Sequence, residues 1–178
     1  MSPRPVPLGF PHKPRRYDSM TEYVTSEEMD AYAADRPDSS AWTGASEADQ
    51  EDALKYSSSL VDSLLFVGRK YDTDQALQWP RLVKVRGVWR VERDDEGDVC
   101  IPQAIKDAVC EEILARLSPT DGKRHALQAD GVKSFRLGDL SETYGDDLRG
   151  GGIKGTPLIS WTAYRLLEPY LAKGARAG

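Results

Sequence analysis

Few side chains in this sequence are of the kinds that carry out chemistry, and they are not grouped. Cys100 and Cys110 are the only cysteines, and their spacing is not that of metal ligands. His12 and His125 are the only histidines, and both lie in polar segments typical of loops. No serine or cysteine therefore has an evident histidine base. We expect two reduced, structural thiols and neither a histidine-based metal site nor a catalytic triad.

Two further segments have the composition of ion-binding loops but lack the required pattern. The acidic run at residues 94–98 has neither the alternating ligands nor the terminal bidentate glutamate of an EF-hand loop. Residues 145–155 contain five glycines, yet no Gly-Lys-Ser/Thr follows as in a phosphate-binding loop. We predict a solvated loop and a flexible linker. The sequence thus predicts no catalytic, metal-binding or cofactor-binding residue and no cofactor, so the protein is not expected to be an enzyme.

Charge is distributed unevenly along the chain. The 178 residues include 24 lysines and arginines and 29 acidic residues, for a net charge of −5. Residues 1–16 hold four of the basic residues and no acidic one, which leaves −9 on residues 17–178. Such an acidic body disfavours non-specific binding of duplex DNA, because it repels phosphates. The candidate partner-binding residues at this end are Arg4, Lys13, Arg15 and Arg16.

The same end of the chain is rich in proline. Residues 1–20 contain five of the eleven prolines, which excludes a helix or a sheet interior and predicts an extended arm. An inert tail and a docking arm both fit this composition. No apolar run approaches the roughly 18–20 residues that span a bilayer, and no secretory signal begins the chain. We expect no membrane partner and a cytosolic place of synthesis.

Apolar residues at helical spacing predict a scaffold of about four helices. The first is short, begins at the capping box Thr25-Ser-Glu-Glu28 and ends before Pro37. The second is long and amphipathic, with Ser46 as its N-cap and Gly68 as its stop. Its apolar stripe is narrow, so this helix should lie against other elements.

Two more helices are expected later in the chain. Pro102 opens one whose apolar surface is wider than a single neighbour needs, so it should be the most enclosed helix. The last helix is predicted near residues 157–171, with Thr156 as its cap. Trp161 lies off the apolar face of that helix and is therefore a candidate for contact with a partner.

The other three tryptophans differ in their sequence surroundings. Trp42 precedes the long helix and Trp79 precedes a proline, and both are expected in the core. Trp89 lies between Arg86 and Arg90. An aromatic side chain interleaved with basic ones is typical of platforms that bind single-stranded nucleic acid.

Two short β segments complete the prediction. Residues 82–91 alternate well enough for one or two short strands turned at Gly87, and residues 132–144 alternate on both sides of Gly138 as in a β-hairpin. The expected fold class is mainly α: a small bundle of about four helices with a short β-hairpin and an extended N-terminal arm. The expected domains are an arm at 1–20, a helical domain at 21–171 and a tail at 172–178.

Several short segments, in a consistent order, resemble the adaptor (head completion) proteins of tailed-phage head–tail connectors. The likeness covers roughly residues 23–171. Its most specific pieces are Leu77-Gln-Trp-Pro-Arg81 and Ile101-Pro-Gln-Ala-Ile-Lys106. Members of that family often carry the label of DnaT-like single-stranded-DNA-binding protein.

The resemblance implies a structural virion protein. It implies a homo-oligomeric, twelve-fold ring between the portal protein and a tail-side stopper or tail-completion protein. Double-stranded DNA would pass through that ring without sequence-specific binding. The protein would be assembled in the host cytoplasm and lie in the neck of the virion. The alternative is a DnaT-like replication protein that binds single-stranded DNA.

Overall fold

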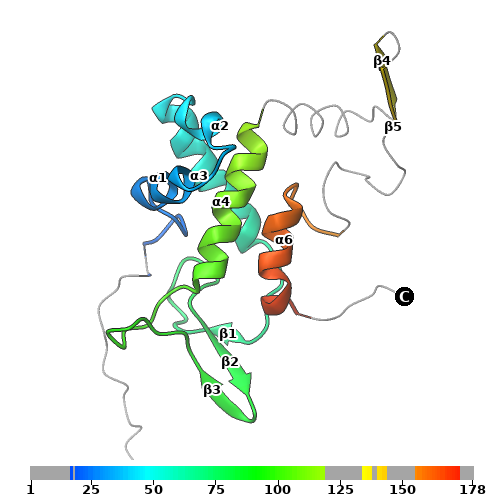
Figure 1. Cartoon of the computed structure of the whole chain (residues 1–178). Coiled ribbons are helices and arrows are strands. Elements are labelled where there is room, and N and C mark those ends of the chain that lie inside the picture. The colour runs from blue at the N-terminus through cyan, green and yellow to red at the C-terminus, as the bar shows by residue number, and fades with distance from the viewer. Residues whose placement is uncertain (1–16, 18, 119–133, 138–139, 144–154, 173–178) are drawn as a thin grey trace, which may run out of the picture.

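The computed structural model describes residues 17, 19–118, 134–137, 140–143 and 155–172 (Figure 1). The helices are α1 (Ser26–Ala34), α2 (Ser40–Thr43), α3 (Glu47–Asp62), α4 (Gln103–Leu117), α6 (Trp161–Leu167) and the 3-10 helix η1 (Glu168–Tyr170). The strands are β1 (Arg69–Lys70), β2 (Arg81–Val85), β3 (Val88–Arg90), β4 (Ser134–Leu137) and β5 (Leu140–Thr143). The predicted fold class, mainly α with short antiparallel β segments, is confirmed. Most of the predicted arm at residues 1–20 and most of the glycine-rich linker lie outside the described residues.

The helix α4 is the centre of the body. The helices α1, α2 and α3 pack on one side of it and α6 on the other (Figure 1). Ile105, Val109 and Ile113 on α4 are completely buried. The expectation that this helix is the most enclosed is confirmed. Pro102 is its N-cap residue rather than its first helical residue.

The first turns of α1 and α3 are capped as the sequence predicts. Thr25 Oγ1 accepts a hydrogen bond from Glu28 N at 3.3 Å, and Glu28 Oε2 accepts one from Thr25 N at 3.0 Å. Ser46 Oγ accepts one from Asp49 N at 3.2 Å. These bonds satisfy amide groups that have no partner within the helix. The short helix α2, which lies between these two, was not predicted.

The long helix ends earlier than predicted, at Asp62 instead of Gly68. After Asp62 the pattern of burial alternates: Leu64 and Phe66 are buried, whereas Leu65 is 75% exposed. Burial with a period of two belongs to extended chain, not to a helix. Contact with the C-terminal segment favours the extended form, because Phe66 forms a β-bridge with Leu171.

The last helix also starts later than predicted. Its N-cap is Ser160 rather than Thr156, and Ser160 Oγ accepts from Ala163 N at 3.1 Å. The backbone N–H groups of Ile159 and Ser160 donate instead to the buried carboxylate of Glu112 on α4. A carboxylate from another helix therefore sets where α6 begins.

Two tryptophans are buried, as predicted. Trp42 is 0% exposed, and its indole N–H donates to Asp30 Oδ1 at 2.7 Å. Trp79 is 2% exposed and lies edge-on between Phe66 and Tyr170, with ring centroids 5.5 and 5.4 Å away. Trp79 thus packs between the segment that precedes β1 and the C-terminal segment.

The strands form two antiparallel units. The first is a three-stranded sheet in the order β1-β2-β3, and the second is the ladder β4-β5. One or two short strands were predicted around Gly87, and the structure has two, which pair as β2 and β3. The predicted hairpin at 132–144 is confirmed by the pairing of β4 with β5. The strand β1 was not predicted. In Figure 1 the three-stranded sheet lies below the helices, where α4 begins.

Candidate nucleic-acid interface

The three-stranded sheet presents an exposed tryptophan among basic side chains. Trp89 on β3 is 45% exposed. The guanidinium carbon of Arg69 on β1 lies 4.8 Å from the centre of the Trp89 ring system, and Lys84 Nζ on β2 lies 5.9 Å from it. Cations at this distance from an indole are attracted by its negative face. Cationic side chains from both of the other strands, β1 and β2, therefore lie close to this one aromatic ring.

Strand register brings these side chains together. Lys84 pairs directly with Trp89, and Arg69 pairs with Leu82. Directly paired residues share a face of the sheet, as do residues two apart in one strand. Arg69, Leu82, Lys84 and Trp89 therefore lie on one face.

A glycine makes the close pairing of β1 with β2 possible. Gly68 has φ +79°, and a Cβ atom at this position would lie 2.1 Å from the carbonyl oxygen of Leu82. Only glycine fits so close to another backbone, and it adopts positive φ without strain. Arg69 follows immediately, so the glycine brings its guanidinium over Trp89.

A buried arginine holds the chain before β1 against the start of β2. Arg81 is 6% exposed, and its guanidinium donates to the carbonyl oxygens of Val67 at 2.9 Å and Gly68 at 2.8 Å. It also donates to Gln78 Oε1 at 2.5 Å. Burial lowers the pKa of Arg81. These bonds satisfy carbonyl groups in a connection that makes few ladder bonds of its own.

The turn between β2 and β3 adds a basic tip. Arg86 and Gly87 have φ angles of 50° and 84°. Positive φ at both central residues is the geometry of the two-residue turns that join antiparallel strands. Both residues are exposed, and neither the three strands nor this turn contains an acidic residue. The exposed basic residues of the sheet and its turn are Arg69 and Lys84 on the face of Trp89, Arg86 in the turn and Arg90 on the opposite face. We call these four residues together the basic sheet surface.

The sequence identified Trp89 but assigned it the wrong basic neighbours. Arg86 is in the turn, and Arg90 is opposite Val83, on the other face of the sheet from Trp89. Adjacent strand residues face opposite ways, so alternation alone excludes Arg90 as a partner of the ring. Lys84 could have been found by pairing the strands about Gly87. Arg69 could not, because no pattern predicted β1.

The partner-interface residues predicted from the sequence are not brought to this surface. Trp161 is on α6, where it is 60% exposed and stacked on Tyr164, with ring centroids 5.4 Å apart and planes at 26°. Its exposure fits a contact with a partner, which stays a prediction. Arg4, Lys13, Arg15 and Arg16 lie outside the described residues.

The groups considered for chemistry are dispersed. Both cysteines are free, and burial raises the pKa of Cys110 to about 12. The acidic loop is exposed and closes on itself, since Asp98 N donates to Asp94 Oδ1 at 2.8 Å. Within the described residues, no three histidine, cysteine, aspartate or glutamate side chains converge as a metal site would require. No described helix has the length and apolar character needed to cross a membrane.

Comparisons with curated proteins and with solved structures yield no match to this chain. The family comparison does: residues 17–178 match a family model, and residues 1–16 lie outside the match.

This match overturns the predicted function of connector adaptor. The matched family is described by single-stranded-DNA binding, which is the alternative that the sequence left open. The ring, the portal and the tail-side partners have no support from it, and the location in the virion neck stays an untested prediction. DNA is the partner that the family description names. The chain belongs to the family described as "Putative DnaT-like ssDNA binding protein".

Proposed function

We propose that this protein binds single-stranded DNA on the three-stranded sheet, with Trp89 as a stacking platform for a base. The observation that carries the proposal is the exposed indole of Trp89 with Arg69 and Lys84 over it. Proteins that bind single strands combine such aromatic platforms with a positively charged track for phosphates. The role proposed is binding without catalysis.

The charge distribution supports this location. Residues 17–178 carry −9 in all, whereas the strands of the sheet and its turn contain basic residues and no acidic one. Phosphates are repelled elsewhere on the acidic body and attracted here. A base can extend the stack on Trp89 or take the place of the Arg69 guanidinium, which then pairs with a phosphate. Duplex DNA holds its bases inside and offers no free base to the ring.

Replacing the platform tests the proposal. We expect Trp89→Ala to weaken binding of a labelled single-stranded oligonucleotide by about 1–3 kcal/mol, or roughly 5- to 150-fold in Kd, because one stacking interaction is lost. Fluorescence anisotropy at low salt measures the Kd. Trp89→Phe keeps an aromatic face and should retain most of the affinity.

Trp161→Ala is the matched control, since it removes an equally large exposed indole from α6. It should leave the Kd unchanged. Equal losses for the two alanine variants, or full affinity without Trp89, would refute binding on the sheet.

A further inference from the structure

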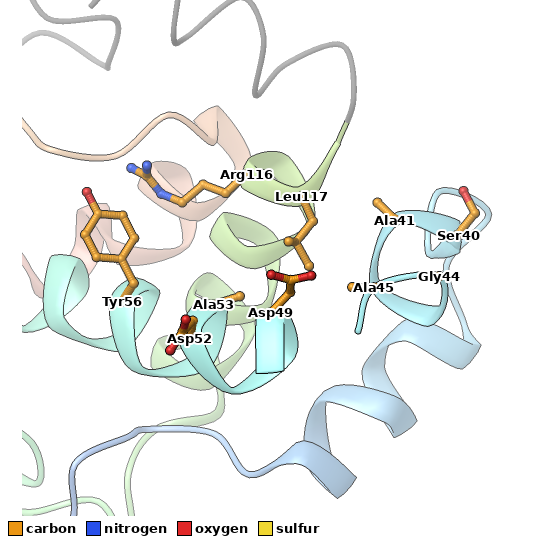
Figure 2. Close-up of a pocket in the computed structure, with 10 residues that line it drawn as sticks. All are labelled: Ser40, Ala41, Gly44, Ala45, Asp49, Asp52, Ala53, Tyr56, Arg116 and Leu117. Atoms are coloured by element: carbon orange, nitrogen blue, oxygen red, sulfur yellow. The ribbon is translucent and has the colours of Figure 1, made fainter. Parts of the chain in front are cut away.

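A groove of about 650 Å³ opens between α2, the first half of α3 and the end of α4 (Figure 2). Small side chains line much of it, among them Ala41, Ala45 and Ala53. Tyr56 stands at one end, 54% exposed. A groove with small walls and an exposed aromatic ring can accept a narrow, extended segment of chain.

The groove is lined by two acidic side chains. Asp49 and Asp52 line it from α3, and within the described part of the chain neither is in an ion pair. Figure 2 shows Asp49 directed into the space below Leu117. The cation in the groove is Arg116, which is paired with the buried carboxylate of Glu112 at 2.8 Å. The guanidinium carbon of Arg116 also lies 5.0 Å from the centre of the Tyr56 ring.

The occupant that this chemistry fits is extended, apolar and basic. Proline-rich segments favour an extended helix without internal hydrogen bonds, and their rings pack on exposed aromatic side chains. Basic residues within such a segment pair with carboxylates on the rim. Nucleic acid does not fit, because Asp49 and Asp52 would repel its phosphates.

The N-terminal segment of this chain has that composition and the necessary reach. Residues 1–10 contain three prolines, Val6, Leu8 and Phe10, with Arg4 as their one charged side chain. The described chain begins at Tyr17, whose hydroxyl donates to the carbonyl oxygen of Val99 at 2.5 Å, near the start of α4. The groove is at the other end of α4, about 22 Å away along a helix of this length.

Seven extended residues cover about 23 Å. Residues before about position 10 can therefore reach the groove from Tyr17, whereas Arg15 and Arg16 cannot.

We propose that residues 1–10 dock in the groove of the same chain, with their proline rings against Tyr56 and the alanines and Arg4 between Asp49 and Asp52. This contact is independent of the binding of DNA on the sheet. It gives the proline-rich segment a partner within the protein.

Photo-crosslinking in the full-length chain tests the proposal. A benzophenone amino acid placed at Leu8 should link, in a product of monomer mass, to peptides that contain residues 40–56. The same probe at Lys13 is the control and should not reach them, because four residues span only about 13 Å. Links from position 8 to other regions, or only in a covalent dimer, would overturn the proposal.

Reversing the charges of the proposed ion pairs tests whether residues 1–10 dock in the groove or are only attracted to the acidic protein in general. Asp49→Lys with Asp52→Lys should lower the yield of the groove link about fivefold, as loss of surface ion pairing predicts. Adding Arg4→Asp should restore the yield. Glu47→Lys with Glu51→Lys makes the same charge change on α3 outside the groove and should leave the yield unchanged. Equal loss in the two lysine pairs would overturn docking in the groove.

Discussion

A single tyrosine shows how a polar group is held in this core. Tyr23 is 1% exposed, and its hydroxyl donates to Asp62 Oδ1 at the end of α3. The same oxygen accepts from the backbone N–H of Gln78 at 2.6 Å. Burial first, and then the hydrogen bond and the charge of Asp62, raise the pKa of Tyr23 above its usual value of 10.0. The folded protein therefore keeps the Tyr23 proton at pH values where an unfolded chain releases it.

This difference predicts a loss of stability in alkali. A raised pKa in the folded state contributes stability that is complete below about pH 10 and is lost as the pH rises further. We expect Tyr23→Phe to make the fall in unfolding free energy above pH 10 shallower by up to about 1.4 kcal/mol per pH unit. At neutral pH the variant should lose about 1–2 kcal/mol with its hydrogen bond. Urea unfolding across pH 7–11 measures both effects, with Tyr56→Phe at an exposed site as the matched control. An unchanged slope would mean that Tyr23 ionises equally easily in the two states.

At the scale of elements, a buried carboxylate joins α6 to α4. Glu112 is 0% exposed, and it accepts from the backbone N–H groups of Ile159 and Ser160 and from Arg116 Nε at 2.8 Å. A buried charge is tolerated only when its lone pairs are used in this way. Glu112 therefore fixes both the start of α6 and its place against α4.

Removing that charge should be costly. We expect Glu112→Gln to lower the free energy of unfolding by about 2–4 kcal/mol, because the amide supplies one acceptor in place of two and leaves Arg116 without a counter-charge. Chemical denaturation measures the loss. Glu47→Gln, at an exposed position on α3, is the control and should change stability by less than about 0.5 kcal/mol. Similar values for the two variants would contradict the role given to Glu112.

The sequence predicted the features that depend on neighbouring residues in the chain, and it did not predict those that depend on contacts between distant segments. The capping box at Thr25, the cap at Ser46 and the turn at Gly87 depend on neighbours in the chain, and all three were predicted. The end of α3 depends on the contact of Phe66 with Leu171, and the start of α6 depends on the hydrogen bonds that Glu112 accepts from Ile159 and Ser160. Both contacts join distant segments, and both predicted boundaries were wrong. The candidate site divides in the same way. Trp89 and its turn were visible in the sequence, whereas the approach of β1 is not encoded by any local pattern.

For the molecule as a whole, charge separates the proposed DNA surface from the rest. Residues 17–178 carry −9, so within this part of the chain we expect attraction for phosphates at the few side chains of the basic sheet surface. Each phosphate that these side chains neutralise releases condensed counterions, and the affinity then falls with salt.

We expect the double variant Arg69→Gln with Lys84→Gln to reduce the slope of log Kd against log salt concentration by about 1.4, or about 0.7 per lost contact with a single strand. Titrations over a range of salt concentrations measure the slope. Lys55→Gln on α3, where the lysine pairs with Glu51, is the matched control and should not alter it. A double variant with the slope of the wild type would show that these two cations do not contact phosphates.

The central position of α4 also bears on how this protein can change in evolution. Eight of its fifteen residues are buried, and α1, α2, α3 and α6 all pack against it. A substitution there that changes side-chain volume disturbs several neighbours at once, and we expect it to lower stability more than one on the surface. The sheet and the groove lie at opposite ends of α4. Their exposed side chains are not packed between several elements as those of α4 are. New binding specificities can therefore arise at either end while the helix between them stays the same.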